Sequence, residues 1–197
     1  MSWDCHTVVM GRTGSGKTHH VNCEIIPQFR KKSILYWLGG HDDVRLRIPF
    51  VNVTGCHDVG TIKSLLSTKK IAVCYTPAFE QERAKKELKY WQEYLMSGQR
   101  ELLFVLDEAQ RYAPQGSIDT AAHILATGAR KFGITCVFVC QRVAELSKTI
   151  ASQCRHWVIF EHSIIDENYL KERGILLTDE EVDMLRNKKY HHVTKEV

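Results

Sequence analysis

The feature that most constrains this chain is the stretch GRTGSGKT, residues 11–18, which fits the pattern G-x-x-x-x-G-K-[ST]. In loops of this pattern, successive backbone N–H groups surround the phosphates of a nucleoside triphosphate. The stretch follows an apolar run at residues 6–10 and opens a helical pattern near Lys17. Because a strand before the loop and a helix after it are the context that the pattern requires, the sequence predicts a phosphate site.

Every residue of this loop is predicted to contact a bound nucleotide, ATP, together with Mg²⁺. Lys17 supplies a positive charge to the β- and γ-phosphates and takes part in catalysis, and Thr18 offers its hydroxyl to the metal. The alternative is a glycine-rich turn that binds nothing, which the strand and helix on either side disfavour. The predicted nucleotide-binding residues are Gly11, Arg12, Thr13, Gly14, Ser15, Gly16, Lys17 and Thr18.

A second motif, ELLFVLDEAQ, begins at residue 101 and predicts a buried strand followed by two carboxylates. Asp107, at the end of that strand, is placed to hold Mg²⁺, usually through a water molecule. Glu108 is one residue further on, where it can reach the water that attacks the γ-phosphorus and act as its general base. The alternative is that Glu108 only caps or solvates the end of the strand.

Three further residues are candidates for catalysis. Gln141 ends a predicted strand, and since the carboxyl ends of parallel strands share one crevice, we expect it beside Asp107, sensing the γ-phosphate or orienting water. Arg130 and Arg142 are candidates for stabilising charge in the transition state, with Arg130 preferred. Such an arginine would be supplied in trans by a neighbouring subunit. A surface residue without catalytic function is the alternative for all three.

Apolar strand-like runs alternate with helical patterns along the chain, which favours an α/β fold with a mostly parallel sheet and helices on both faces. The tail, residues 187–197, either adds an edge strand or frays. A single domain is expected over residues 1–197, with a core at about 6–160 and a C-terminal extension at about 161–197. The expected strands are 6–10, 33–38, 50–53, 71–75, 102–106, 134–140 and 156–160.

Two helices are predicted between these strands. The first covers residues 80–95 and places Ala84, Leu88, Trp91 and Leu95 on one face. The second covers residues 117–133, with Ser117 or Asp119 as its cap and with Ile118, Ala122, Leu125, Ala129 and Phe132 on its apolar face.

Composition excludes several other classes of protein. The sequence contains no run of eighteen uncharged apolar residues, so no membrane span is predicted. The first residues do not resemble a secretory signal. The seven cysteines contain no C-x-x-C pair, and Cys136 and Cys140 lie too far apart on one strand face to be bonded, so neither a zinc site nor a structural disulfide is supported. The net charge of +4 is compatible with a polyanionic partner without requiring one.

Together, the stretches GRTGSGKT, LLFVLDEAQR and GARKFGITCVFVCQR resemble the FtsK–HerA superfamily of DNA-pumping P-loop ATPases. The third stretch is the most specific, because arginine-lysine-aromatic-glycine before a strand that ends in glutamine is much rarer than a phosphate loop. Within the superfamily, the chain looks most like the genome-packaging ATPases of archaeal turreted icosahedral, membrane-containing viruses. The similarity spans roughly residues 8–160.

This resemblance implies a RecA-like core, a homo-oligomeric ring of five or six subunits, and ATP-driven movement of double-stranded DNA into a preformed capsid. It assigns Lys17, Thr18, Asp107, Glu108 and Gln141 the same roles as their chemistry suggests. It also implies a capsid or membrane-associated vertex protein as partner, and a location in the host cytoplasm or the virion. The chain is expected to lack the membrane anchor of chromosome translocases and the extra barrel of cellular HerA proteins.

Other interpretations stay open at this point. Another DNA pump or helicase of the FtsK–HerA type shares the same core. A small-molecule or nucleoside kinase would not need Glu108 to activate water, and a protein that uses ATP only as a switch would show no steady-state turnover. Candidate DNA contacts are two basic groups, with a solvated helix face as the alternative for each: Arg83, Lys85 and Lys86, and Lys188 and Lys189.

Overall fold

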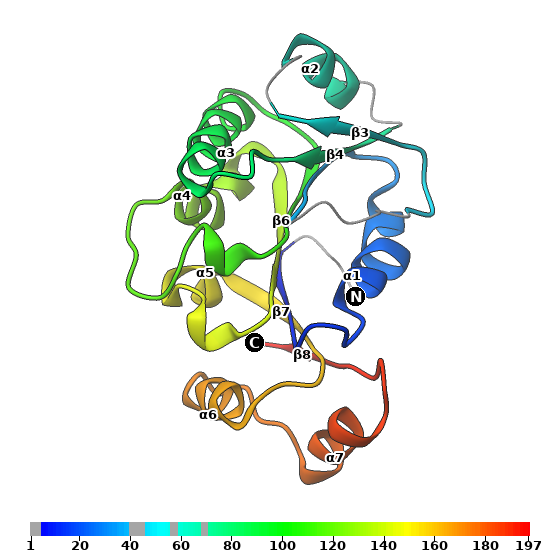
Figure 1. Cartoon of the computed structure of the whole chain (residues 1–197), viewed down its shortest axis with the longest axis vertical. Helices are drawn as coiled ribbons and strands as arrows, with labels where there is room; N and C mark the ends of the chain where they lie inside the picture. The colour runs from blue at the N-terminus through cyan, green and yellow to red at the C-terminus, as the bar shows by residue number, and fades with distance from the viewer. Residues whose placement is uncertain (1–4, 40–45, 56–58, 68–70) are drawn as a thin grey trace.

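The computed structural model describes residues 5–39, 46–55, 59–67 and 71–197, which form an eight-stranded sheet flanked by helices (Figure 1). The strands are β1 His6–Met10, β2 Ser33–Trp37, β3 Phe50–Thr54, β4 Ala72–Thr76, β5 Leu102–Leu106, β6 Ile134–Cys140, β7 Cys154–Ile159 and β8 Val193–Glu196. Their order across the sheet is β3-β4-β2-β5-β6-β1-β7-β8. All neighbours are parallel except β7 and β8, which are antiparallel. The predicted mostly parallel sheet is therefore confirmed.

All seven predicted strands are present. Three of them, β1, β5 and β6, have the predicted bounds, and the other four differ by no more than two residues at either end. The three are central strands whose residues are all buried, so they are rich in apolar residues and are easily recognised in the sequence. The eighth strand, β8, comes from the tail, which therefore joins the sheet edge and does not fray.

Helices cover both faces of the sheet, as predicted. In Figure 1, α1 lies on one side and α3, α4 and α5 lie on the other, while α6 and α7 extend beyond the β8 edge. After its last residue, α1 continues through a π-helical turn, Val21–Ile25, and a 3-10 turn, Ile26–Phe29. The helices are α1 Lys17–His20, α2 Val59–Ser67, α3 Gln81–Leu95, α4 Ala121–Gly128, α5 Lys148–Gln153, α6 Ile164–Glu172 and α7 Asp179–Asn187.

Alternating side chains of the sheet form two hydrophobic clusters, one on each face. On β5, Phe104 and Leu106 belong to the cluster that contains the buried residues of α3 and α4. Leu103 and Val105 belong to the other cluster, with the helical segment that follows the 11–18 loop. Since every residue of β5 is buried, the strand that leads to the acidic pair is packed on both faces.

The first predicted helix is confirmed as α3, whose predicted apolar face, Ala84, Leu88, Trp91 and Leu95, is buried. The second, predicted over 117–133, is shorter than expected. Its α-helical part is α4, and residues Ala129–Phe132 form a 3-10 turn instead. Ile118 does not lie on the apolar face, because it precedes the helix and is 80% exposed.

The predicted caps of this second helix are also wrong. Asp119 has φ 54°, in the left-handed region, and therefore cannot belong to a right-handed helical turn. Thr120 is the cap instead of Ser117 or Asp119, since its hydroxyl accepts the backbone N–H of His123. The His123 ring in turn accepts the backbone N–H of Thr120, completing a reciprocal cap in which histidine replaces the usual glutamate.

The described cysteines are free thiols. Cys136 and Cys140 are buried free thiols on β6, and Cys56 lies outside the described residues. No group of three or more histidine, cysteine or acidic side chains in the described ranges is arranged to hold a metal ion. Within the same ranges, no helix combines the length and the apolar character needed to cross a membrane.

The core predicts a matched pair of phenylalanine variants. We expect Phe104→Ala to lower the free energy of unfolding by about 3–5 kcal/mol, because Phe104 is fully buried and its loss leaves a cavity. Phe79→Ala should change it by less than about 0.5 kcal/mol, because that ring is 91% exposed. Urea denaturation followed by circular dichroism measures both. Equal effects would contradict the assignment of Phe104 to the core.

Candidate functional site

The 11–18 loop joins β1 to α1 at the carboxyl edge of the sheet. The Lys17 side chain is buried, and its ammonium donates hydrogen bonds to the backbone oxygens of Gly11, at 2.6 Å, and Arg12, at 3.0 Å. Burial lowers the pKa of Lys17, while the nearby Cys140, Glu108 and Asp107 act in the opposite direction. The lysine charge is therefore held inside the loop, where it lowers the pKa of Asp107 in the acidic pair after β5.

The other side chains of the loop have different surroundings. Arg12 is exposed and pairs with Glu161 at 3.0 Å. The Ser15 hydroxyl is buried and makes no hydrogen bond within the described structure, whereas Thr18 is exposed. A buried hydroxyl without a partner is unfavourable, so Ser15 favours a ligand that supplies one.

Asp107 lies at the end of β5, with only 8% of its surface exposed. Burial first, and then the charge of Glu108, raise the pKa of Asp107 to about 6, although the carboxylate accepts the backbone N–H of Glu108 at 2.9 Å. A buried carboxylate of this kind is stabilised by a cation. The carboxylate of Asp107 and the hydroxyl of Thr18 are hard oxygen ligands of the type that Mg²⁺ prefers, so these two residues fit the predicted metal.

Glu108 has an unusual backbone conformation, with φ 50° and ψ 42° in the left-handed region. Both of its carboxylate oxygens accept amide hydrogen bonds: Oε1 from Gln141 at 2.8 Å, and Oε2 from Gln110 at 2.5 Å. Left-handed backbone at a residue other than glycine is unfavourable and occurs preferentially at functional sites. In this conformation the carboxylate is bonded to Gln141, the residue that follows β6.

Gln141 connects the acidic pair to the loop. Its amide nitrogen donates to Glu108, and its amide oxygen accepts a hydrogen bond from the Thr13 hydroxyl at 3.0 Å. The sheet order explains this contact, because β6 lies between β5 and β1 and the three strands end at the same edge. The structure thus brings together Thr13, Lys17, Asp107, Glu108 and Gln141, as expected from the sequence, although their roles stay predictions.

The two arginine candidates are not drawn into this cluster. Arg142 is partly exposed and pairs with Glu145 at 2.8 Å. Arg130 lies in the turn before β6, and its charge acts on Cys5 and His6 at the start of β1. Since five residues of strand span about 16 Å, Arg130 lies far from the loop that follows β1 in the same chain. A role for Arg130 in catalysis therefore requires a second subunit.

Gly39 is a residue of the site that sequence reasoning missed. A methyl group at Gly39 would lie 2.5 Å from Cγ of Glu108 and 3.2 Å from a carboxylate oxygen of Asp107. The Gly39 carbonyl accepts a hydrogen bond from Arg111 at 2.8 Å, and Arg111 also donates to Gln81 at 3.0 Å. The available signal was weak: a glycine pair directly after a predicted strand.

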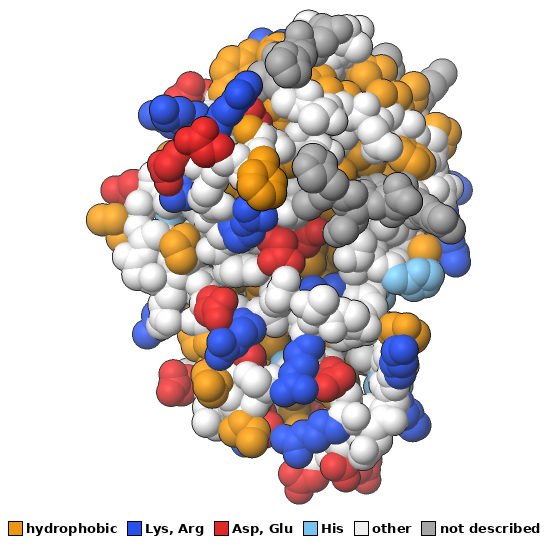
Figure 2. All heavy atoms as spheres, in the orientation of Figure 1, with side chains coloured by type: hydrophobic (Ala, Val, Ile, Leu, Met, Phe, Trp, Pro, Cys, Tyr) orange, Lys and Arg blue, Asp and Glu red, His pale blue; other side chains and the backbone are white. Residues whose placement is uncertain are grey.

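The predicted DNA-binding groups differ in how far their charges are neutralised. Arg83 and Lys85 form ion pairs on their own helix, with Glu87 and Glu82, which favours a solvated helix face for this group. Lys188 and Lys189 are exposed and follow α7. On the face shown in Figure 2, basic and acidic side chains of the described residues are interspersed and do not form a single basic patch.

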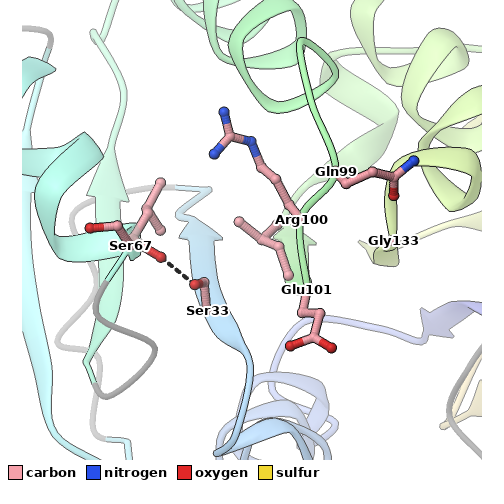
Figure 3. Close-up of a pocket in the computed structure, with 8 residues that line it drawn as sticks. Ser33, Ser67, Gln99, Arg100, Glu101 and Gly133 are labelled. Carbon is pink, nitrogen blue, oxygen red and sulfur yellow. Dashed lines mark hydrogen bonds between the residues drawn. The ribbon is translucent and has the colours of Figure 1, made fainter.

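A cleft of about 350 Å³ lies at the opposite, amino edge of the sheet (Figure 3). Its arginine, Arg100, donates to the backbone oxygens of Tyr94 and Leu95 and thereby caps the end of α3. Ser33, also in this cleft, donates to the backbone oxygen of Leu66. Because these polar groups are used within the fold and no predicted site residue lines the cleft, the carboxyl edge is the candidate site.

Comparison with known proteins gives one family match. The model of the family described as zonular occludens toxin (Zot) matches residues 6–192. No curated protein sequence matches the chain significantly.

Several solved structures are similar to this one. The genome packaging NTPase B204 from Sulfolobus turreted icosahedral virus 2, in complex with AMPPCP, has a TM-score of 0.72 and 17% identity, over 100% of this chain and 94% of that one. The N-terminal domain of zonular occludens toxin from Neisseria meningitidis has a TM-score of 0.52 and 14% identity, over 98% and 93%. EssC (ATPases 2 and 3) from Geobacillus thermodenitrificans has a TM-score of 0.56 and 12% identity, over 98% and 38%. These likenesses confirm the predicted RecA-like P-loop fold.

The close approach of Gly39 to the acidic pair predicts the effect of a single methyl group. We expect Gly39→Ala to reduce nucleoside triphosphate hydrolysis by about 100-fold, because the methyl group displaces Glu108 and a shift of about 1 Å has an effect of this size. Gly98→Ala is the matched control, since a methyl group there meets no atom within 4 Å. Steady-state phosphate release measures both variants. Equal activities would remove Gly39 from the site.

The buried charge of Asp107 predicts a pH-dependent gain in stability for Asp107→Asn. The pKa of Asp107 rises from 3.8 to about 6 on folding, so the ionised carboxylate lowers the free energy of unfolding. This loss has its full size above about pH 6 and is absent below about pH 4, where the carboxyl group is protonated in both states. Without metal or nucleotide, we expect Asp107→Asn to raise the free energy of unfolding by about 1–3 kcal/mol at pH 8. The gain should disappear as the pH falls to about 4.

Denaturant unfolding at pH 8 and at pH 4 measures this difference. Glu145→Gln, which removes an exposed carboxylate at the same edge of the sheet, is the control. If Asp107→Asn raises the free energy of unfolding equally at both pH values, the ionised carboxylate does not destabilise the fold.

Proposed function

The chain belongs to the zonular occludens toxin (Zot) family, and we propose that it is a P-loop ATPase of the FtsK–HerA type that moves double-stranded DNA into a preformed viral capsid. The observation that carries the ATPase part is the hydrogen-bonded chain from Thr13 through Gln141 to Glu108. The similarity to a genome packaging NTPase supports DNA as the cargo.

The first step in the proposed mechanism is binding of the triphosphate. The backbone N–H groups of the 11–18 loop surround the phosphates, and the Lys17 ammonium exchanges its two backbone oxygens for phosphate oxygens. This exchange replaces two neutral acceptors with anionic oxygens, to which the ammonium is attracted more strongly. Thr18 and Asp107 would hold Mg²⁺, which when bound would offset negative charge on the phosphates.

The second step is proton transfer from the attacking water to Glu108. Gln141 holds Oε1 of this carboxylate through one amide hydrogen bond, and since a carboxylate oxygen has two acceptor positions, one stays available for water. Thr13 links Gln141 to the loop, so a change in the phosphates can alter the position of the base. A base held for water favours hydrolysis over transfer to another acceptor, and this argues against a kinase.

The position of Arg130 supports the proposal of a ring. Because Arg130 lies at the amino edge of its own sheet, it can stabilise the transition state only in a neighbouring subunit. We therefore propose a homo-oligomeric ring of five or six subunits that acts with a capsid or membrane-associated vertex protein. Lys188 and Lys189 are the proposed DNA contacts, since phosphate contacts bind the backbone without reading bases.

The proposal predicts the behaviour of Glu108→Gln with duplex DNA. We expect linear double-stranded DNA to stimulate ATP hydrolysis by the wild type, with an effect that decreases steeply as salt rises. Glu108→Gln should bind ATP and DNA normally but hydrolyse ATP about 10²- to 10⁴-fold more slowly, because it loses the general base. Phosphate release measures hydrolysis, filter binding measures DNA binding, and titration with a fluorescent nucleotide measures ATP binding.

Glu93→Gln serves as the control, because it makes the same change at an exposed site on α3, a helix that carries none of the predicted catalytic residues. Hydrolysis by Glu108→Gln at the wild-type rate would exclude Glu108 as the base. If duplex DNA neither binds at low salt nor changes the turnover of the wild type, DNA is not the cargo.

A further inference from the structure

A second cleft, of about 630 Å³, lies beside the 11–18 loop. It extends from the start of α1 to the turn between α7 and β8, so its two sides come from opposite ends of the chain. A volume of this size is typical of sites for small organic molecules. The lining residues are Gly16, His19, His20, Glu24, Phe160, Tyr190 and His192.

The floor of this cleft is a packed group of three aromatic rings. Pairing of β8 with β7 sets Val193 opposite Ile159, which brings His192 next to Phe160, with ring centroids 5.2 Å apart. His20, on α1, packs against both rings, at 4.3 Å from His192 and 5.7 Å from Phe160. The sheet thus fixes one side of the cleft, and the helix after the loop fixes the other.

Tyr190 forms the rim of the cleft. It has φ 64°, in the left-handed region, although it is not a glycine. The residue is 60% exposed. Its Cδ1 lies 3.2 Å from the position that a Cβ on Gly16 would take, so the ring touches the loop. A large exposed ring held in an unfavourable backbone conformation beside a phosphate loop indicates a surface that binds a ligand.

The carboxylate among the lining residues favours an uncharged aromatic ligand over a phosphate, and the ammonium of Lys189 lies over the Tyr190 ring, 5.0 Å from its centroid. Burial lowers the pKa of His192, which favours the neutral form of this imidazole. Glu24 is the carboxylate among the lining residues. Phosphates would be repelled by that carboxylate, whereas an amino group on a flat ring can donate a hydrogen bond to it.

We propose that this cleft binds the nucleobase of the nucleotide, a purine with an exocyclic amino group, which stacks on Tyr190. The inference rests on the proposed function, because it requires the phosphates of the same nucleotide to lie on the 11–18 loop. Gly16 and His19 line the cleft and flank Lys17 and Thr18, so the cleft begins where the phosphate-binding residues end. The C-terminal segment is then part of the nucleotide site.

The test compares two ligands that share a phosphate chain. AMPPCP carries a base and resists hydrolysis, whereas inorganic tripolyphosphate carries none. We expect Tyr190→Ala to weaken AMPPCP binding by about tenfold, since loss of one base-stacking contact has roughly this effect, and to leave tripolyphosphate binding unchanged. Isothermal titration calorimetry with Mg²⁺ measures both. Tyr190→Phe should bind like the wild type, because it keeps the ring.

Tyr90→Ala is the matched control, because Tyr90 is also a partly exposed tyrosine but lies on α3, on the other side of the sheet. An equal loss of both ligands in Tyr190→Ala would show that the ring only supports the loop, and no loss of either would exclude stacking. Equal affinity of the wild type for both ligands would also overturn the inference, while leaving phosphate binding intact. If the wild type binds neither ligand, the proposed function itself fails, and this inference with it.

Discussion

The site depends on the placement of β6 between β5 and β1, which lets a single amide, that of Gln141, touch both halves of the site. Its nitrogen donates to Glu108 and its oxygen accepts from Thr13. Each of the three residues follows a different fully buried strand, so their relative positions are set by backbone hydrogen bonds and by packing on two faces. A rigid sheet of this kind holds reacting groups more precisely than loops alone can.

This arrangement reduces the stability of the fold. Asp107 is buried with a raised pKa, Glu108 has a left-handed backbone, and the buried Ser15 hydroxyl has no partner within the described structure. Each feature is unfavourable for folding and favourable for binding a ligand that supplies the missing cation or hydrogen bond. Their presence at one edge of the sheet, around one loop, is the physical reason to place function there.

The C-terminal segment contributes residues to the carboxyl edge of the sheet, beside the phosphate loop, and no motif in its sequence predicts this. By pairing with β7, β8 carries Tyr190 and His192 to the phosphate loop, which belongs to the beginning of the chain. The antiparallel strand also covers β7, which would otherwise be an open edge. Closing the sheet and completing one side of a cleft are therefore done by the same short strand.

Local sequence patterns were enough to predict the 11–18 loop, the acidic pair after β5, the seven parallel strands and the helix α3, because each depends on a short motif or a repeating apolar pattern within one segment. Other features of the site depend on how distant segments pack together. Thr120 replaced the expected cap because Asp119 turns left-handed, Gly39 entered the site by close approach to Glu108, and Arg130 fell at the far edge of the sheet. Which strands become neighbours, and which distant residues then touch, depends on the packing of the whole chain, and no local pattern in the sequence encodes it.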